Sequence, residues 1–332
     1  MVTLEQIKLA QRRLRGIAAR TALVPYFPPA TAHLRGNGAQ GQLWLKPESL
    51  QPVGSFKVRG AHNKIASFTD EERQRGVISY SSGNHAQGVA YAARALGVKA
   101  VIVMPRNAPK RKVDSTAALG AEIVTVGPAS TERMKKAEEL ARDHGYAIVP
   151  PYNDGQIIAG QGTVGLEILK DCPEVDLVLV PVGGGGLISG VSAAIKLSGS
   201  KARVIGVEPE LANDAQQSLH RNEIIELPAE RVSSTLADGL RTQSIGPLNF
   251  AHIRSFVDDI ITVTEDEIRA AMRRAVTDAR IVAEPSGAVT FAAWLFHAQE
   301  LPESAQAVAI VSGGNVEPQL LAQVLAEENV SE

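Results

Sequence analysis

Short runs of apolar, mostly β-branched residues alternate along the chain with segments whose apolar residues recur at helical spacing. Strands that are apolar on both faces and alternate with helices form parallel sheets covered by helices. The sequence therefore predicts an α/β protein with two doubly wound, open parallel sheets. The predicted strands are residues 77–80, 100–104, 122–126, 146–149, 176–182, 203–207 and 307–311, and the predicted helices are residues 86–96, 110–119, 131–144, 187–198 and 286–297.

The predicted elements fall into two groups that meet near residue 150. Pro150 and Pro151, followed by Tyr-Asn-Asp-Gly, are typical of a loop and indicate a crossing between domains. We therefore expect a small domain at residues 68–150 and a large domain made of residues 1–67 together with residues 151–332. Residues 213–240 lack a repeating apolar pattern and are interpreted as a long excursion near the functional site.

The charge balance limits the partners. Lys and Arg total 34 and Asp and Glu total 36, so the net charge is -2, which argues against nucleic acid or an anionic membrane as the main partner.

No apolar run approaches the roughly 20 residues of a membrane span. The N-terminal residues around Glu5 predict an amphipathic helix rather than a targeting peptide, so we expect a cytoplasmic protein. Cys172 is the one cysteine and is expected to be a buried thiol.

Four successive glycines, Gly183, Gly184, Gly185 and Gly186, follow one predicted strand and open a helix. Exposed backbone N–H groups and the helix dipole favour binding of a phosphate or another anion there. The loop lacks the Lys-Ser/Thr ending of a P-loop and matches a dinucleotide motif imperfectly. Because Glu208 ends the next strand, where a ribose-binding acid would lie, a nicotinamide enzyme stays open as an alternative at this point.

Three further motifs carry groups with possible chemistry. Lys57 lies in the run Gly-Ser-Phe-Lys-Val-Arg-Gly, and a desolvated lysine with a neighbouring cation has a lowered pKa and can form a Schiff base. The run Ser-Ser-Gly-Asn-His at residues 81–85 and the run Ser-Gly-Gly-Asn at residues 312–315 each follow a strand, at the sheet edge where ligands bind. Taken singly, they are also consistent with a surface lysine and a helix cap.

Together these motifs, in this order, resemble the pyridoxal-phosphate enzymes of fold type II, the tryptophan-synthase-β type. Within that family the chain is similar to the branch of threonine/serine dehydratases and serine racemases. The resemblance extends over residues 21–316. It implies that pyridoxal 5'-phosphate is bound in the cleft between the two domains.

The resemblance assigns cofactor-binding roles to residues of all four motifs. Lys57 would hold the cofactor covalently, Asn84 would bond its phenolic oxygen, and Ser312 would face its pyridine nitrogen. A serine does not keep that nitrogen protonated as an aspartate would, which favours β-elimination over a long-lived carbanion. The glycine loop with Leu187 would hold the phosphate. The remaining implied neighbours of the cofactor are Phe56, Asn153 and Glu284.

The resemblance also implies a substrate site. The turn that contains Ser81, Ser82, Gly83, Asn84 and His85 would bind the substrate carboxylate, and Lys57 would accept the Cα proton. Ser82 would protonate the opposite face in a racemase, but dehydratases of the branch carry it too. Gly239 would lie near the substrate. Arg133 would lie near the entrance, although a solvated helix face explains it equally well.

The run from Val207 to Asp214 resembles the divalent-cation loop of the family. Glu208 and Asp214 would supply carboxylates, and Ala212 would supply a backbone carbonyl oxygen. Oxygen ligands suit Mg²⁺, Mn²⁺ or Ca²⁺ rather than zinc. An acidic surface loop is the alternative reading. The cation site would explain Glu208 better than a ribose contact does.

The function implied is a pyridoxal-phosphate-dependent ammonia-lyase that converts L-threonine and L-serine to 2-oxobutanoate and pyruvate. Met134 stands beside Arg133 where racemases of the branch carry an acidic residue, which favours the dehydratase. A serine or other amino-acid racemase and a lyase for 3-hydroxyaspartate or another 3-hydroxy amino acid remain alternatives. The family also implies a homodimer or homotetramer.

Overall fold

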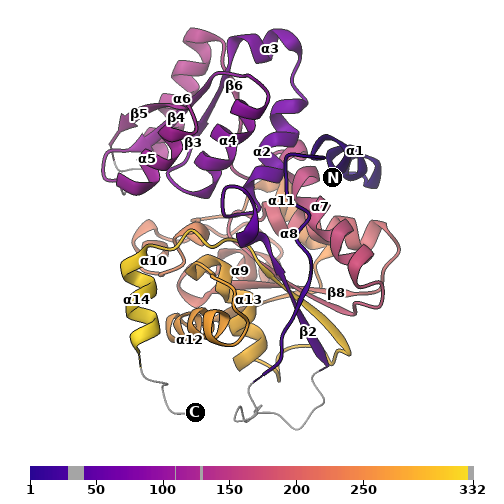
Figure 1. The fold of residues 1–332 in the computed structure, drawn as a ribbon. Coiled ribbons are helices and arrows are strands. Elements are labelled where there is room, and N and C mark those ends of the chain that lie inside the picture. The colour runs from indigo at the N-terminus through magenta and orange to yellow at the C-terminus, as the bar shows by residue number, and fades with distance from the viewer. Residues whose placement is uncertain (29–40, 109, 128–129, 328–332) are drawn as a thin grey trace.

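The computed structural model describes residues 1–28, 41–108, 110–127 and 130–327 (Figure 1). The strands are β1 (Val24–Pro25), β2 (Gln42–Pro47), β3 (Val77–Tyr80), β4 (Ala100–Pro105), β5 (Glu122–Val126), β6 (Ala147–Ile148), β7 (Leu177–Pro181), β8 (Arg203–Pro209), β9 (Asp259–Val263) and β10 (Gln306–Val311). The α-helices are α1 (Leu4–Arg13), α2 (Lys57–Ala66), α3 (Asp70–Arg75), α4 (Asn84–Ala95), α5 (Lys110–Ala118), α6 (Ser130–His144), α7 (Gly155–Asp171), α8 (Gly186–Leu197), α9 (Asp214–Arg221), α10 (Ala229–Ser233), α11 (Pro247–Phe256), α12 (Glu265–Thr277), α13 (Pro285–Phe296) and α14 (Pro318–Ala326). Short 3-10 helices are η1 (Glu48–Leu50), η2 (Glu210–Ala212) and η3 (Asp238–Leu240).

The larger sheet has the strand order β1-β2-β10-β7-β8-β9 and is parallel except for the β1–β2 pair, which is antiparallel. Alternate residues of its central strands point to opposite faces, as the pleat requires. Leu177 and Leu179 pack with α12 and α13, whereas Val178 and Val180 pack with α7 and α8. Helices therefore cover both faces, which explains why these strands are apolar throughout.

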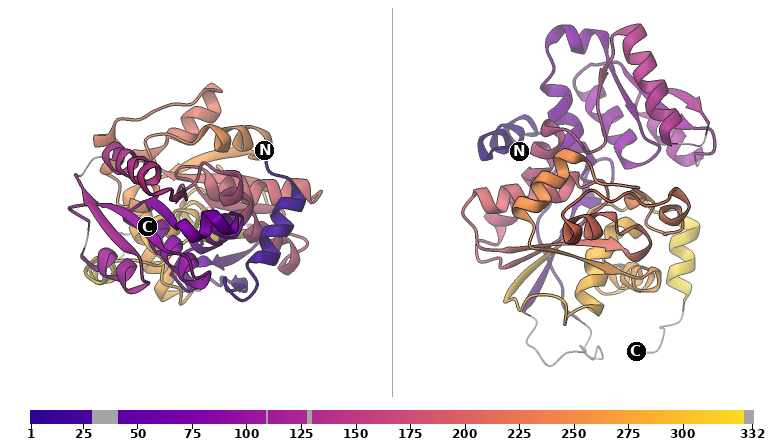
Figure 2. Two further views of the ribbon diagram at one scale, coloured as in Figure 1. Left: turned by 90° about the horizontal axis from the view of Figure 1, so that it is seen from above. Right: turned by 180° about the vertical axis from the view of Figure 1, so that it is seen from behind.

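The smaller sheet has the order β5-β4-β3-β6, with all pairs parallel. Ile102 packs with α2 and α4 on one face, and Val101 and Val103 pack with α6 on the other. The two sheets occupy opposite ends of the molecule, with the smaller one in the upper part of Figure 1 and of the right-hand view of Figure 2. The predicted α/β class with two doubly wound parallel sheets is confirmed.

Several elements were not predicted, and for β2 and α7 the structure shows a local reason. The apolar pattern of β2 is interrupted by Lys46, which is buried in an ion pair. Helix α7 contains Gly160, Gly162 and Gly165, which lower helix propensity; a Cβ atom on Gly160 would lie 2.6 Å from the Arg59 carbonyl oxygen. Close packing against α2 and α8 requires those glycines. Strands β1 and β9 and helices α2, α3, α11, α12 and α14 were also missed.

The predicted excursion at residues 213–240 contains the short helices α9 and α10, with η3 at its end. The predicted N-terminal helix is α1, which begins after a capping box at Thr3. Helix α2 packs against both α4 and α7, so the domain limits at residues 67 and 150 remain a prediction. Cys172 is a free, buried thiol. Among the described residues, no helix has the length and apolarity needed to span a membrane.

A buried set of charges joins β2, η1, α2 and α7. Arg59 is only 1% exposed and donates to both oxygens of Glu48 at 2.7 and 2.8 Å and to those of Glu167 at 2.7 and 2.9 Å. Lys46, also fully buried, donates to Glu167 at 2.6 Å. Burial alone would raise the pKa of Glu48, but the Arg59 guanidinium holds it below its usual value. Two cations and two anions thus neutralise one another in the interior.

Replacing one member of this set should strongly destabilise the protein. We expect Glu48→Ala to lower the free energy of unfolding by about 3–5 kcal/mol, because Arg59 keeps a buried charge with half of its partners removed. Urea unfolding followed by circular dichroism measures this. The control is Asp114→Ala, which removes the exposed pair with Lys110 and should change stability by about 0.5 kcal/mol or less. Equal losses in the two variants would contradict the argument.

Candidate active site

The position of Lys57 is fixed from both sides along the chain. Ser55 forms an isolated antiparallel bridge with Gly313, and the Phe56 N–H donates to the Ser312 carbonyl oxygen at 3.1 Å. Two residues after Lys57, Arg59 enters the buried charge set. Lys57 is therefore the first residue of α2 and is held against the loop that follows β10.

The surroundings of the Lys57 amine favour its neutral form. Burial lowers the pKa of Lys57 to about 8, although the negative charge of Glu284 opposes the shift. The amine donates to the Pro151 carbonyl oxygen at 2.9 Å and lies 5.2 Å from the centre of the Phe56 ring. Gly88 allows α4 to lie close to the start of α2, since a Cβ atom on Gly88 would lie 3.0 Å from the Lys57 carbonyl carbon.

The glycine loop lies between the end of β7 and the start of α8, as predicted. Gly185 has φ +88°, the left-handed region that favours glycine, and Gly186 is the first residue of the helix. The first N–H groups of a helix have no intrahelical acceptor, and the dipole makes that end positive. A Cβ atom on Gly184 would overlap the Tyr152 ring. The loop is a cradle for an anion, with Tyr152 packed against it.

The turn at residues 81–83 joins β3 to α4, and its three residues are half-buried. The Gly83 N–H approaches the Ser81 Oγ at 3.4 Å. His85 is buried and its Nε2 lies 3.1 Å from the Val149 carbonyl oxygen. Burial and the nearby Lys57 charge lower the pKa of His85 to about 3, so the imidazole is neutral and donates to that carbonyl. The turn itself therefore carries no net charge.

Asn84, the first residue of α4, connects the two sheets. Its Nδ2 donates to Glu284 Oε1 at 2.6 Å, and its Oδ1 accepts from Asn315 Nδ2 at 2.7 Å. Burial, followed by the charge of Asp238, raises the pKa of Glu284 to about 7, while the Asn84 hydrogen bond opposes the shift. Of these residues, the sequence predicted Asn84 and Glu284.

The remaining predicted cofactor neighbours lie in the larger-sheet part of the site. The Ser312 hydroxyl is buried and donates to the Ser286 carbonyl oxygen at 3.3 Å. Ser286 Oγ in turn accepts from the N–H of Gly239, in η3, at 2.9 Å. Asn153 Oδ1 accepts from the Leu248 N–H at 3.0 Å. Ser312 and Gly239 are thus joined through Ser286, a residue that the sequence analysis did not select.

The two predicted metal-binding carboxylates lie close enough to interact. Glu208, at the end of β8, accepts from the N–H groups of Ala215 and Gln216 at 3.1 and 2.8 Å. Asp214 is buried, and within the described residues neither of its oxygens has a hydrogen-bond partner. Burial raises the pKa of Asp214 to about 7; burial and the Asp214 charge raise that of Glu208. Ala212 is buried in η2 between them in sequence.

These carboxylates are the donor set that a hard cation needs, and the unpaired oxygens of Asp214 fit one. No group of three or more His, Cys, Asp or Glu side chains is placed to hold a metal within the described part of the chain. Backbone carbonyl oxygens or waters would therefore have to complete the coordination, which suits Mg²⁺, Mn²⁺ or Ca²⁺.

Arg133 lies on α6, a helix that carries none of the other predicted site residues. This helix covers the face of the smaller sheet opposite α4. The side chain is half-buried, and burial lowers its pKa. Its place at a substrate entrance remains a prediction.

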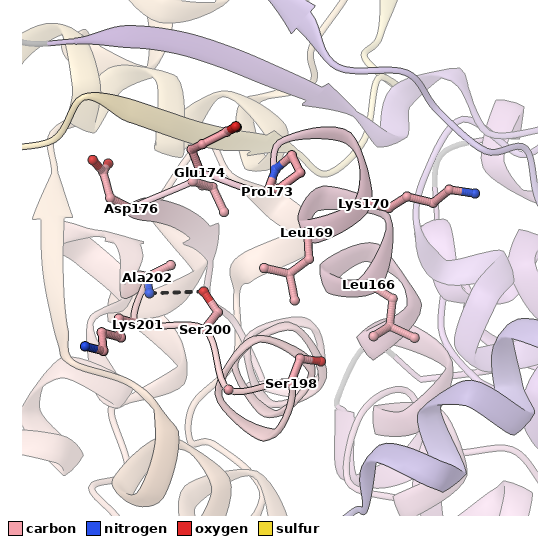
Figure 3. Close-up of a pocket in the computed structure, with 12 residues that line it drawn as sticks. Leu166, Leu169, Lys170, Pro173, Glu174, Asp176, Ser198, Ser200, Lys201 and Ala202 are labelled. Atoms are coloured by element: carbon pink, nitrogen blue, oxygen red, sulfur yellow. Dashed lines mark hydrogen bonds between the residues drawn. The ribbon is translucent and has the colours of Figure 1, made fainter.

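A separate depression of about 630 Å³ lies at the ends of α7 and α8, where β7 and β8 begin (Figure 3). Leu166 and Leu169 line it together with the loop that contains Ser198 and Ser200. It is at the edge of the sheet opposite the glycine loop, and none of the predicted site residues lines it. Ligands in open α/β sheets bind at the carboxyl ends of strands, so the chemistry belongs to the glycine-loop edge.

Besides Ser286, the sequence analysis missed two site residues, Tyr152 and Asn315. Both residues lie inside motifs that the sequence showed. Tyr152 follows the double proline, and Asn315 ends the Ser-Gly-Gly-Asn run. An aromatic residue among turn residues and an amide directly after two glycines were the available signals. Neither signal tells which atoms the side chain contacts, so only the fold shows the roles.

The groups that surround Lys57 fit pyridoxal 5'-phosphate. A lysine amine of lowered pKa, a glycine cradle at a helix N-terminus and a neutral buried hydroxyl match its aldehyde, phosphate and pyridine nitrogen. The fold and site thus define a pyridoxal-phosphate enzyme of two open parallel sheets. The family of pyridoxal-phosphate dependent enzymes matches residues 19–313, and the chain belongs to it.

Relatives with different names are similar to this chain in sequence, and a solved structure is also similar in fold. The chain is 45% identical over 328 residues to the L-threonine ammonia-lyase of Thermotoga maritima, covering 98% of this chain and 78% of that protein. It is 40% identical to the L-threo-3-hydroxyaspartate ammonia-lyase of Saccharomyces cerevisiae, with 90% of each chain covered. Maize serine racemase matches with a TM-score of 0.90 and 37% identity, covering 97% of this chain and 96% of that one.

The lowered pKa of Lys57 predicts a measurable pH dependence of stability without cofactor. Since the pKa rises from about 8 in the folded chain to its ordinary 10.5 on unfolding, the unfolded chain binds more protons between these values. Wild-type stability from this group therefore increases as the pH rises through that window. We expect Lys57→Met to be more stable than wild type at pH 7 by roughly 3 kcal/mol.

Urea unfolding of both cofactor-free proteins between pH 7 and 10.5 measures this difference. The advantage of Lys57→Met should shrink as the pH rises, because the wild-type amine is then neutral in both states. A constant difference across the range would show that the Lys57 amine keeps its ordinary pKa.

Proposed function

We propose that the chain is a pyridoxal-phosphate-dependent ammonia-lyase that converts L-threonine to 2-oxobutanoate and L-serine to pyruvate, with release of ammonia. The observation that carries the proposal is the desolvated Lys57 amine at the junction of the two sheets. The bound cofactor would supply an electron-withdrawing ring that acidifies the Cα proton of an attached amino acid. The reaction removes that proton and the β-hydroxyl group, and water then replaces the amino group.

Lys57 acts as the base in this proposal. With a pKa of about 8, about one tenth of such amines are neutral at pH 7, whereas an ordinary lysine would be neutral about once in several thousand. The Pro151 carbonyl oxygen holds the protonated amine after it has taken the Cα proton. The neutral His85 avoids placing a second cation beside it.

The other predicted residues bind and orient. Gly183 to Gly186 with Leu187 hold a phosphate through backbone N–H groups at the start of α8. Ser312 presents an uncharged hydroxyl, and Asn84 presents an amide N–H beyond the one that it gives Glu284. Phe56 and Asn153 flank the cofactor.

The substrate carboxylate is held by the turn at residues 81–85, whose backbone N–H groups lie at the start of α4. Gly239 faces the substrate from η3. Ser82 lies in the same turn and is within the half-buried part of the site. The only position that we propose for Arg133 is near the substrate entrance.

The racemase is the second candidate, and Ser82 is the observation that favours it. A hydroxyl in the substrate turn, on another element than Lys57, provides a proton donor for the face away from the lysine. A lyase for 3-hydroxyaspartate requires the same Cα deprotonation and differs only in the side chain accepted. These activities differ in products, so one assay separates them.

The test is keto-acid release from L-threonine, L-serine, D-serine and the 3-hydroxyaspartates, with cofactor and Mg²⁺ present. We expect turnover of L-threonine and L-serine, and a loss of at least about a thousandfold in Lys57→Ala because both the base and the covalent anchor are removed. Lack of keto acid from L-threonine and L-serine would overturn the dehydratase. Chiral analysis of the remaining serine would then identify a racemase.

We also propose a divalent cation, Mg²⁺, Mn²⁺ or Ca²⁺, at Glu208, Ala212 and Asp214. The two unpartnered oxygens of Asp214 support it. After chelation, adding back a cation at about a hundred times its Kd should stabilise the protein by about 2.7 kcal/mol. The measurement is thermal unfolding with each cation. Asp214→Asn should abolish the increase, and an increase of the same size in that variant would place the cation elsewhere.

The oligomeric state and location complete the proposal. A homodimer or homotetramer is proposed from the family resemblance, and light scattering of the purified protein measures it directly. The cytoplasmic location remains a prediction of the sequence.

A further inference from the structure

Asn315 is the centre of a hydrogen-bond chain that crosses between the two sheets. Its Nδ2 donates to the Val53 carbonyl oxygen at 2.8 Å and to Asn84 Oδ1 at 2.7 Å. Asn84 Nδ2 then donates to Glu284 Oε1 at 2.6 Å. Each member of the chain is buried or half-buried, so water competes weakly for these groups.

One group that can only accept determines which atoms donate along this series of hydrogen bonds. The Val53 carbonyl oxygen requires a donor, so the atom of Asn315 that faces it must be the amide nitrogen. The same nitrogen faces Asn84, which must therefore turn its carbonyl oxygen toward Asn315. Its amide nitrogen is left pointing to Glu284, where a carboxylate accepts. The orientation of Asn84 is thus set from outside that residue.

Asn315 also holds Glu284 directly. Its backbone N–H faces the Glu284 carboxylate and opposes the rise of that pKa, together with the Asn84 amide and the positive charge of Lys112. Burial and Asp238 raise that pKa, and Lys57 is the other charged group beside Glu284. One residue therefore restrains both partners of the Asn84–Glu284 hydrogen bond.

The local backbone is built for this contact. Gly54 has φ +69°, and a Cβ atom on it would overlap the Asn315 amide oxygen. Gly54 also accepts, through its carbonyl oxygen, the Gly314 N–H at 2.9 Å. The turn before Lys57 thus closes around the Asn315 side chain.

We propose that Asn315 is a positioning residue that fixes the amide of Asn84 with its N–H group toward the cofactor side. The inference rests on the proposed function, in which the second N–H of Asn84 bonds the phenolic oxygen of pyridoxal 5'-phosphate. In the reversed orientation Asn84 would present a carbonyl oxygen to that oxygen, and the contact would be repulsive. Asn315 would then determine cofactor affinity without touching the reacting atoms.

The first test compares Asn315→Leu and Asn315→Asp with wild type. Leucine has nearly the same shape but removes the donor to Asn84 Oδ1, so Asn84 is held only by Glu284, whereas aspartate accepts an N–H from Asn84 and favours the reversed orientation. We expect the cofactor Kd to rise severalfold in Asn315→Leu and by about tenfold or more in Asn315→Asp. The absorption maximum of the bound cofactor should shift in the same order. Wild-type Kd and spectrum in Asn315→Leu would overturn the proposal, because any effect of aspartate would then be that of its charge.

Asn63→Asp is the matched control. Asn63 is a buried amide on α2 that donates to a main-chain carbonyl oxygen, that of Gln156, at 2.7 Å. The same substitution there should lower the unfolding midpoint of the cofactor-free protein and leave the cofactor Kd unchanged. A similar rise of Kd in this control would show that Asn315 acts through stability alone.

A double variant separates orientation from folding. In Asn315→Asp combined with Glu284→Gln, the glutamine can donate to the reversed Asn84, so only the Val53 carbonyl oxygen still lacks its donor. We expect the unfolding midpoint to recover relative to Asn315→Asp while the Kd stays high. Recovery of the Kd as well would overturn the proposal. Absence of a borohydride-reducible cofactor band in wild type would instead overturn the proposed function itself.

Discussion

The ion set around Arg59 is the constraint on which the rest of the structure depends. A guanidinium that is 1% exposed is tolerable only when both flanking carboxylates, those of Glu48 and Glu167, are in place. Glu48 comes from η1, directly after β2, and Glu167 comes from α7, so the start of α2 is fixed to the larger-sheet part at two points. Lys57 lies two residues before Arg59 and has little freedom left.

The fixed, buried position of Lys57 determines the pKa of its amine. Burial lowers the pKa of Lys57, and the double-proline segment supplies an acceptor for it without supplying a competing N–H. The same segment continues into Tyr152, which packs on the glycine loop, and begins at Val149, whose carbonyl oxygen receives Ser79 and His85. One short connection between the sheets thus contacts Lys57, the glycine loop and the elements that flank the turn at residues 81–83.

The sequence predicted most of the parallel strands and all four motifs, because buried strands and glycine-rich turns leave strong local patterns. It missed β2, whose Lys46 looks like a surface residue until Glu167 of a distant helix is placed beside it. It missed α7, whose glycines weaken helix propensity but permit contact with α2 and α8. Asn315 lies in one of the predicted motifs, but the sequence predicted no role for it. The orientation of its amide depends on partners that are 231 and 262 residues away.

The separation of those partners along the chain also orders events during synthesis. Arg59 finds Glu48 eleven residues earlier but must wait for Glu167, 108 residues later. Chain emerging from the ribosome at about 5–20 residues per second completes the strands of the smaller sheet before α7 exists. For several seconds the nascent chain therefore carries its lysine in an unfinished, hydrated setting, and the environment that lowers the pKa of this amine is among the last features to be assembled.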